Sequence, residues 1–273
     1  MSAMSVLSAI TSSSRPPLWR EARFGLEAAA LLRDPVLRGE GLADGRGRPV
    51  LLIPGFMAGD SSLAPMSDWL RRAGYRPSRA GMRANVGCAG AGHERLEERL
   101  ERLVAEQGQR AVVIGQSRGG SMAKVLAVRR PDLVCGLVTL GSPHVDPLAV
   151  HPLVRLQVEA LSRLGSLGAP GLFTRACLDG DCCASFWDDL GAPLAAGVGF
   201  VAVYSRSDGI VDWRACLDPC ADEQVEIAAS HCGMAVSPAA WRTVANAFEG
   251  FRRADTRRVG AKAQRLRKLR RVA

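Results

Sequence analysis

The sequence predicts an α/β protein in which a mostly parallel central sheet is covered by helices on both faces. Two short, fully apolar runs, at residues 50–53 and 111–114, are typical of strands buried on both sides of a parallel sheet. Each run is followed by a glycine-containing turn and then by a helical pattern. Strands and helices that alternate in this way imply a parallel sheet between two layers of helices. The chain of 273 residues is above the typical domain size but within reach of one such domain.

The first part of the chain contains three helical patterns and two candidate strands. Residues 1–17 are rich in Ser and Pro and are expected to be disordered. The clearest helix lies at 94–107, where Leu96, Leu100 and Leu103 recur at spacings of three and four among charged residues. We expect helices at 18–32, 62–73 and 94–107 and strands at 50–53 and 75–80.

The second part of the chain continues the alternation, with one interruption. We expect strands at 111–114, 133–140, 200–204 and 224–228, a helix that ends at Arg129 and a helix at 241–251. Residues 145–195 have weaker periodicity and are a candidate cap, in which Phe173, Phe186 and Trp187 offer apolar surface to a ligand. The alternative is a pair of helices packed on the sheet, with these aromatic residues in the core. The α/β domain as a whole is expected at 18–250.

The net charge of the chain is confined to its C-terminal end. Residues 251–273 hold ten of the 36 Lys and Arg residues and one of the 27 Asp and Glu residues, so the whole formal charge of +9 falls there. A segment of this charge density repels itself, and we interpret it as a solvated basic tail. Attachment to an anionic membrane surface is the candidate role of such a tail. No specific nucleic-acid partner is expected, because the rest of the chain is neutral.

Composition and targeting signals indicate an ordinary globular protein. The hydrophobic fraction is 47% and the charged fraction is 23%. No run approaches the roughly 18 consecutive apolar residues of a transmembrane helix. The N-terminal segment lacks the basic residue and the unbroken apolar stretch of a secretory signal. A cytoplasmic location is therefore expected, with membrane association through the basic tail as an extension of it.

The eight cysteines do not define a disulfide or metal framework in the sequence. Their pairings are too numerous for the sequence to give a connectivity, and reduced thiols are expected in a cytosolic chain. Zinc is not predicted, because no C-x-x-C pair or His/Cys ligand spacing occurs. Six of the eight lie late in the chain: Cys177, Cys182, Cys183, Cys216, Cys220 and Cys232.

The pattern Gly-Gln-Ser-Arg-Gly at 115–119 carries the strongest chemical signal. It lies between the strand at 111–114 and a helical pattern, which is the context that a G-x-S-x-G turn requires. In that turn the serine is held in strained backbone, and the glycines avoid clashes with neighbouring segments. A serine alcohol needs a base, an orienting acid and oxyanion donors before it acts as a nucleophile. Ser117 is therefore the candidate nucleophile.

The candidate base follows by elimination among four histidines. In folds with this turn, an acid follows the serine in the chain, and the histidine follows the acid. His93 precedes Ser117, and His144 and His151 come too early to follow an acid on a later strand. His231 lies in a loop after the last predicted strand and is the candidate base.

The candidate acid must follow the penultimate strand, where it can orient the histidine. Asp208 lies four residues after Tyr204, and Asp212 lies four residues further on. Asp208 is preferred because it is closer to the strand end, and Asp212 is the alternative.

Two backbone N–H groups are needed to bind an oxyanion. The residue after the nucleophile, Arg118, supplies one of them. The other is expected from the glycine-containing loop at 54–59, where Phe56 is the preferred donor and Met57 the alternate.

Together these segments resemble the α/β-hydrolase superfamily, and in particular its bacterial lipase and esterase branch. Five motifs occur in the same order over about residues 48–250: the oxyanion segment at 54–59, the nucleophile turn at 115–120, the strand end at 141–144, the acid loop at 204–211 and the histidine loop at 230–233. The resemblance implies an α/β-hydrolase fold. It also implies a catalytic triad of Ser117, Asp208 and His231, with Phe56 and Arg118 in the oxyanion hole.

The chain departs from this branch at three places. Pro54 replaces a histidine, Arg118 is charged where a small, apolar or histidine side chain is usual, and the cysteine-rich loop at 177–183 has no counterpart in the pattern. The expected function is that of a serine hydrolase that cleaves small-molecule or lipid carboxylic esters, with no metal or organic cofactor. An acyltransferase or thioesterase with the same triad is the alternative, and a non-catalytic binding scaffold is a further one.

Overall fold

The computed structural model describes the backbone of residues 16–272 and the side chains of residues 16–256. Six strands form one sheet in the order β2-β1-β3-β4-β5-β6, and every neighbouring pair is parallel. The predicted α/β class is therefore confirmed. The strands are β1 (Pro49–Ile53), β2 (Arg76–Arg79), β3 (Ala111–Gln116), β4 (Val134–Leu140), β5 (Gly199–Tyr204) and β6 (Glu223–Glu226).

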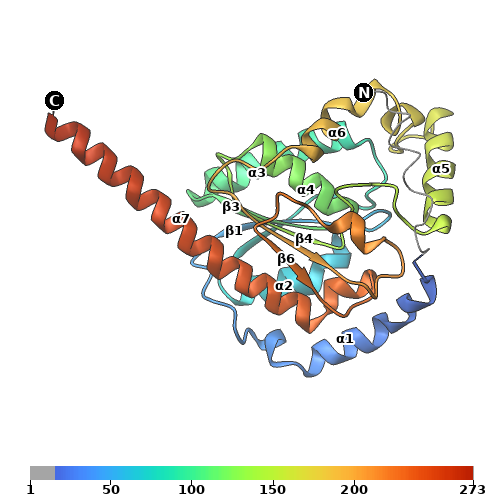
Figure 1. The fold of residues 1–273 in the computed structure, drawn as a ribbon, viewed down its shortest axis with the longest axis horizontal. Helices are drawn as coiled ribbons and strands as arrows, with labels where there is room; N and C mark the ends of the chain where they lie inside the picture. The colour runs from blue at the N-terminus through green and yellow to red at the C-terminus, as the bar shows by residue number, and fades with distance from the viewer. Residues whose placement is uncertain (1–15, 273) are drawn as a thin grey trace.

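Helices connect the strands and cover both faces of the sheet (Figure 1). The α-helices are α1 (Phe24–Arg33), α2 (Ala64–Arg72), α3 (Ala89–Gln107), α4 (Arg118–Arg129), α5 (Pro152–Ser166), α6 (Ala184–Gly191) and α7 (Pro238–Val272). Short 3-10 helices are η3 (Leu18–Arg23), η4 (Pro35–Arg38), η5 (Asp60–Leu63), η6 (Arg175–Cys177), η7 (Asp181–Cys183), η8 (Trp213–Cys216) and η9 (Cys232–Val236).

Each expected strand and helix of the domain is present, with shifted ends. The largest shift is at α7, which ends at Val272 and not at Phe251. The next largest is at α3, which begins at Ala89 and not at Glu94. Its first turn consists of Ala and Gly residues, so the leucine periodicity that predicts the helix starts only at Leu96. The residues expected to be disordered, 1–17, lie almost wholly outside the described part of the chain.

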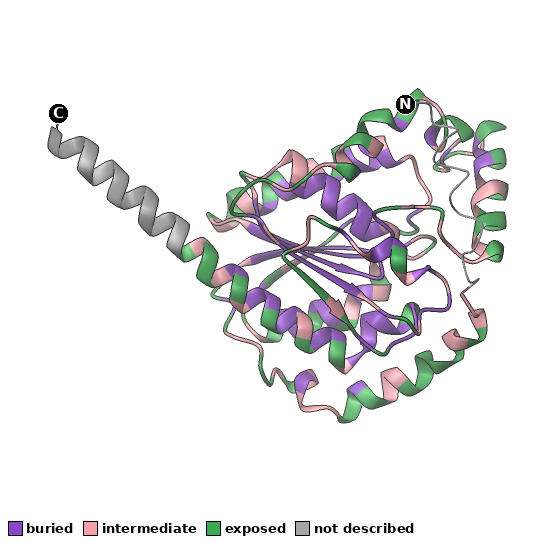
Figure 2. Cartoon of the chain, in the orientation of Figure 1, coloured by how far each residue is buried: buried purple, intermediate pink, exposed green. Residues whose placement is uncertain are grey.

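The sheet separates two hydrophobic cores, because successive residues of a strand point to opposite faces. Val50 and Leu52 of β1 pack with α1, α2 and α7 in one core. Leu51 and Ile53 pack with α3, α4 and α6 in the other. Figure 2 shows the central strands as buried along their length. Burial on both faces explains why these strands are apolar runs without alternation.

The first turns of the expected tail belong to the packed domain. Phe251 on α7 is 6% exposed, and its ring lies against Gly136 of β4 and Gly199 of β5. A Cβ atom at either glycine would overlap this ring. The expected boundary after Gly250 therefore falls inside α7, at a point where the helix still covers the sheet.

Ion pairs continue this packing for one more turn. Asp255 receives hydrogen bonds from Arg48 at 3.0 Å and from Arg110 at 2.5 Å. Burial raises the pKa of Asp255, but the hydrogen bonds and charges of the two arginines outweigh it and lower the pKa. α7 continues as a helix to Val272 and extends beyond the sheet (Figure 1). The side chains of 257–273, which carry most of the predicted basic tail, lie outside the described ones.

The candidate cap at 145–195 divides into two parts. α6 packs on α4, where Asp189 pairs with Arg129 at 2.5 Å, and Phe186 is 2% exposed. This part fits the expectation of a helix packed beside the sheet. α5 lies outside this packed part, and its side chains Leu156 and Leu153 are 64% and 52% exposed. The segment before α5 is attached to the loop after β5 by an antiparallel bridge between Val150 and Val211.

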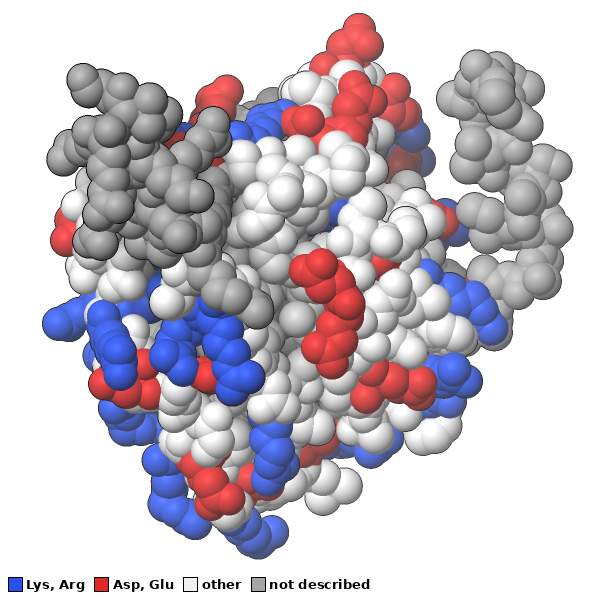
Figure 3. Space-filling model, turned by 60° about the vertical axis from the view of Figure 1, so that its left-hand side comes forward, with Lys and Arg blue, Asp and Glu red and all other residues white. Residues whose placement is uncertain are grey.

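Charges on the described surface are mixed in sign. Figure 3 shows Lys and Arg side chains interspersed with Asp and Glu side chains on one face of the molecule. Among the described helices, none combines the length and the apolar character that crossing a lipid bilayer requires.

Two truncations separate the packed and the extending parts of α7. Removal of 257–273 keeps Phe251 and Asp255, and the free energy of unfolding in urea should stay close to that of the full chain. Removal of 251–273 deletes both residues and should lower it by about 3–5 kcal/mol, the range for loss of a buried phenylalanine. The point variant Phe251→Ala should lower it as well, and Arg253→Ala, at an exposed position of the same helix, serves as its control. Equal unfolding free energies for the two truncated chains would contradict the packing described here.

Candidate active site

A pocket of about 880 Å³ lies at the carboxyl ends of the strands. In parallel sheets these ends meet at one edge, where ligands commonly bind. Ser117 from the turn after β3, Phe56 from the loop after β1 and His231 from the loop after β6 all line this pocket. The opposite wall comes from residues 145–191 and is largely apolar, with Leu148, Val154, Phe173, Leu178 and Trp187 among its members.

Ser117 has the strained backbone conformation that its motif predicts. Its φ is 52° and its ψ is −127°, in a region that L-residues rarely adopt. A Cβ atom at Gly115 would overlap the backbone of Gly119, and one at Gly119 would overlap the carbonyl of Ile53. The turn is held from the other side because the N–H of Ser117 donates to the carbonyl of Leu140 at 2.8 Å. Both glycines of the motif are therefore needed for close packing of the turn.

His231 and Asp208 form a buried pair. Nδ1 of His231 lies 2.7 Å from Oδ2 of Asp208, and the two residues are 5% and 3% exposed. The other oxygen of Asp208 accepts N–H groups of Ile210 at 2.8 Å and of Val211 at 2.7 Å. Three hydrogen bonds thus fix the carboxylate and orient the imidazole.

Asp212, the alternative acid, has a different position. Its carboxylate accepts the N–H of Arg214 at 3.0 Å and caps the 3-10 helix η8. Arg214 also forms an ion pair with it at 3.3 Å. Of the two aspartates, Asp208 is the one that the structure brings to His231.

The carboxylate of Asp208 determines the protonation of His231. Burial lowers the pKa of His231, but the charge and hydrogen bond of Asp208 outweigh it, and the charge of Glu21 adds to them. The pKa is therefore raised above the ordinary 6.5. Gln116, the neighbour of Ser117, donates its side-chain N–H to the carbonyl of His231 at 3.1 Å. This bond ties the nucleophile turn directly to the histidine loop.

Glu21 is a site residue that the sequence analysis missed. One carboxylate oxygen accepts the N–H of Gly209 and the N–H of His231, both at 2.9 Å. The other accepts the N–H of Cys232 at 2.9 Å. Glu21 lies in η3, far away in sequence from both loops, so no local pattern indicates this role. It bonds the acid loop and the histidine loop to each other.

Glu27 in α1 supports the same loop one step away. Its two oxygens accept the N–H of Ser230 at 2.8 Å and the hydroxyl of Ser230 at 2.6 Å. A Cβ atom at Gly233 would overlap this carboxylate. The segment Ser-His-Cys-Gly at 230–233 therefore donates hydrogen bonds to the carboxylates of two glutamates from the N-terminal helices, Glu21 and Glu27.

The predicted oxyanion donors flank Ser117. Arg118 is the first residue of α4, and Phe56 follows Gly55, whose added Cβ would lie 3.2 Å from Cβ of Ser117. Asn85 holds the loop that contains Phe56. Its side chain donates to the carbonyl of Pro54 at 2.8 Å, and its own N–H donates to the carbonyl of Ala58 at 2.9 Å.

The side chain of Arg118 is directed toward the cysteine-rich loop. Its Nη2 donates to the carbonyl of Gly87 at 2.6 Å, and its guanidinium lies 5.2 Å from the ring centroid of Phe173. Burial lowers the pKa of Arg118, and nearby cysteine sulfurs act in the opposite direction. The charged residue at this unusual position is thus stacked and hydrogen-bonded at the base of the pocket.

The other three histidines are held by other contacts. His144 lines the pocket, and its Nε2 lies 3.1 Å from the hydroxyl of Thr139. Burial lowers its pKa to about 3, so it is neutral. Burial also lowers the pKa of His93, to about 4. His151 accepts the N–H of Leu153 and caps α5.

The chain is a three-layer α/β domain with a serine turn and a His–Asp pair at the ends of its strands. Comparison with solved structures identifies the fold to which this arrangement belongs. A soluble variant of monoglyceride lipase from Saccharomyces cerevisiae aligns with 78% of this chain and 87% of its own, with a TM-score of 0.55 and 17% identity. The mature lipase BlEst2 of Bacillus licheniformis aligns over 71% and 89%, with a TM-score of 0.53 and 15% identity. The monoacylglycerol lipase of Paleococcus ferrophilus aligns over 78% and 96%, with a TM-score of 0.52 and 14% identity.

At these identities the likeness defines the fold. The chain has the α/β-hydrolase fold, as the resemblance in its motifs implied. No protein-family model matches the sequence.

The contact of Glu21 with the histidine loop can be measured by NMR. The charge of Glu21 favours the protonated form of His231, so Glu21→Gln should lower the pKa of His231. Glu98→Gln, at an exposed position of α3, should leave it unchanged. Titration of the histidine ring protons in both variants gives the comparison. An unchanged or raised pKa in Glu21→Gln would contradict the described position of Glu21.

Proposed function

We propose that the protein is a serine hydrolase that cleaves carboxylic esters through a covalent acyl-enzyme. The observation that carries this proposal is the arrangement at one end of the pocket. Ser117 stands there in a strained turn, and the His231 loop is bonded to that turn and paired with Asp208. Such a set supplies a nucleophile, a base and an orienting acid.

In the proposed first step, His231 accepts the proton of Ser117 as the serine oxygen attacks the ester carbonyl. The carbonyl carbon becomes tetrahedral, and its oxygen becomes negative. The N–H groups of Phe56 and Arg118 donate to this oxyanion; the amide of Arg118 lies in the first turn of α4, where the helix dipole also favours a negative charge. Protonated His231 then gives its proton to the leaving alcohol.

In the second step, water repeats the sequence on the acyl-enzyme. His231 removes a proton from water, the hydroxide attacks the acyl carbon, and Ser117 leaves with the proton returned by His231. Asp208 stays ionised throughout and stabilises the imidazolium that forms twice per cycle. The buried hydrogen bonds to Asp208 keep the imidazole in one tautomer.

The pocket favours a substrate with an apolar acyl group. Its volume of about 880 Å³ lies near the upper end of the usual range for ligand sites, roughly 300–1,000 Å³. Phe173, Leu178, Trp187 and Leu190 from the segment before β5 provide apolar surface for methylene groups. The structural neighbours include a monoglyceride lipase bound to a substrate analogue and two further lipases. An ester with a medium-length acyl chain is accordingly the proposed substrate class.

The nucleophile can be tested by covalent labelling. A fluorophosphonate probe should label the wild-type chain and fail to label Ser117→Ala, with Ser121→Ala as a control at a nearby buried serine. Turnover of a p-nitrophenyl ester by Ser117→Ala should fall by on the order of a million-fold, which leaves the contribution of binding and oxyanion donors. Labelling that persists in Ser117→Ala would refute the assignment. Acyl thioesters hydrolysed much faster than esters of equal chain length would favour the thioesterase alternative.

The acid can be tested through rate and pH profile together. Asp208→Asn should lower kcat by up to about ten-thousand-fold, because the wrong tautomer of His231 is favoured. Asp212→Asn should have a much smaller effect. Since the base must be neutral, kcat/KM of the wild type should rise with pH around a midpoint above 6.5. Asp208→Asn removes the charge that raises the pKa, so its midpoint should move to lower pH. A larger loss in Asp212→Asn would mean that the other aspartate is the acid.

A further inference from the structure

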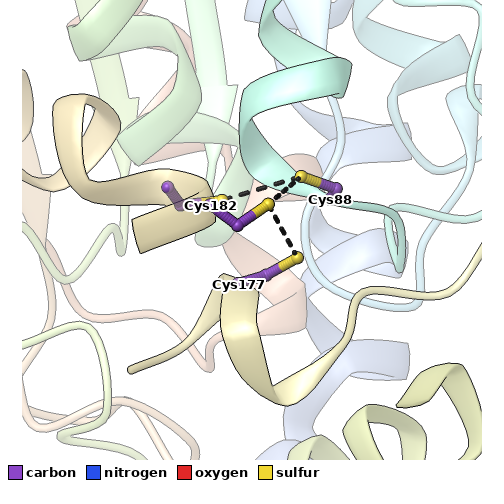
Figure 4. A group of neighbouring side chains, drawn as sticks. Cys88, Cys177 and Cys182 are labelled. Carbon is purple, nitrogen blue, oxygen red and sulfur yellow. Dashed lines mark hydrogen bonds between the residues drawn. The ribbon is translucent and has the colours of Figure 1, made fainter. Parts of the chain in front are cut away.

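Four cysteines that are distant in sequence meet at one point beside the pocket. Cys88 immediately precedes α3, Cys177 ends η6, and Cys182 and Cys183 end η7. Their sulfur atoms all lie within 4.8 Å of one another. Figure 4 shows Cys88, Cys177 and Cys182 with their sulfurs directed toward a common centre.

The spacing of the sulfurs fits one tetrahedral metal ion. Cys88 lies 3.6 Å from Cys182 and 3.6 Å from Cys183, and Cys177 lies 3.6 Å from Cys182. A zinc ion with Zn–S bonds of about 2.3 Å holds its sulfurs about 3.8 Å apart, from the geometry of a tetrahedron. A disulfide would require about 2.0 Å, and all four residues are free thiols.

We propose that Cys88, Cys177, Cys182 and Cys183 bind a structural zinc ion. The set is closed, with four protein sulfurs and no position left for water, as in structural and not catalytic zinc sites. Four thiolates in a tetrahedral arrangement are soft ligands. This combination favours zinc over the divalent ions that prefer oxygen ligands.

The surroundings suit the net charge of such a centre. Four thiolates and Zn²⁺ together carry a charge of about −2, from one negative charge per ligand. The guanidinium of Arg118, bonded to the carbonyl of Gly87 directly before Cys88, is the adjacent cation. A thiolate centre therefore gives this half-buried arginine an anionic neighbour.

Backbone N–H groups at the start of α3 add to this stabilisation. Cys88 is the N-cap residue of α3, and the sulfurs of Cys88 and Cys183 lie beside Gly90 in the first turn of this helix. Helix N-termini favour negative charge, so thiolates are stabilised there.

The zinc ion would fix one wall of the pocket. Cys177 at the end of η6, the following Leu178, and Phe186 and Trp187 of α6 line the pocket, as does Ala89 of α3. A bond from Cys88 to the three later cysteines joins these elements across a long stretch of chain. The metal site does not depend on the proposed ester hydrolysis, and its test is read from metal content and folding stability.

The first experiment measures metal in the full chain, purified with reductant and dialysed against buffer that contains zinc and then against metal-free buffer. Elemental analysis should give one zinc per chain. Cys88→Ser and Cys182→Ser should each lose most of it, and Cys220→Ser, a cysteine outside the cluster, should retain it. Cobalt substituted for zinc in the wild type should give the strong sulfur-to-cobalt absorption of a tetrahedral thiolate site. That readout needs no variant and is independent of how well the variants fold.

The second experiment measures stability and thiol state. Removal of zinc by a chelator should lower the melting temperature of the wild type and of Cys220→Ser and should have little effect on Cys88→Ser. Three outcomes would overturn the proposal: a wild-type chain without zinc, zinc retained by the double variant Cys88→Ser and Cys182→Ser, or iron in its place. Disulfide bonds among these cysteines in the freshly purified chain would overturn it as well. They would be detected as a mass lower by two hydrogens per disulfide and then mapped to the residues that form them.

Discussion

The site depends on the positive φ of Ser117 at the end of β3. A conformation of this kind costs on the order of 1–3 kcal/mol and persists only where its surroundings enforce it. Here the end of β1 and the start of α4 approach the turn at Gly115 and Gly119, where any side chain would overlap backbone. The bond from the N–H of Ser117 to the carbonyl of Leu140 adds a restraint from β4. The serine is therefore aimed into the pocket by the core of the protein and not by a ligand.

A second restraint comes from the N-terminal helices. The loops that carry Asp208 and His231 follow different strands, β5 and β6. Glu21 bonds both loops with one carboxylate, and Glu27 holds the residue before His231. Carboxylates that accept several backbone N–H groups form strong, directional contacts. The same charge that positions the loop also raises the pKa of His231, so position and proton affinity are coupled.

The sequence predicts those parts of the protein whose cause is local. β1 and β3 can be predicted because burial on both faces makes them apolar runs. The turn at Ser117 can be predicted because the glycines that it requires lie within five residues of sequence. The roles of Glu21 and Cys88 cannot be predicted from the sequence, for the opposite reason. Each acts on segments far away in the chain, and neither belongs to a spacing pattern of its own. The distribution of charge predicts a boundary after Gly250, whereas Phe251 and Asp255 pack on the domain because of the glycines and arginines that they contact in space.

Arg118 joins the local and the distant parts of this structure. Its backbone belongs to the first turn of α4, next to Ser117, where helix amides are free to meet an oxyanion. Its side chain extends to Gly87, Phe173 and the cysteine cluster. A small residue would serve the backbone role equally well, so the guanidinium needs a separate reason. An anionic centre formed by the four sulfurs supplies that reason, because a charge beside a half-buried cation replaces part of its lost hydration. The charged side chain at residue 118 and the cysteine-rich loop at 177–183 both depart from the family pattern. The four-sulfur centre then gives both departures one physical cause.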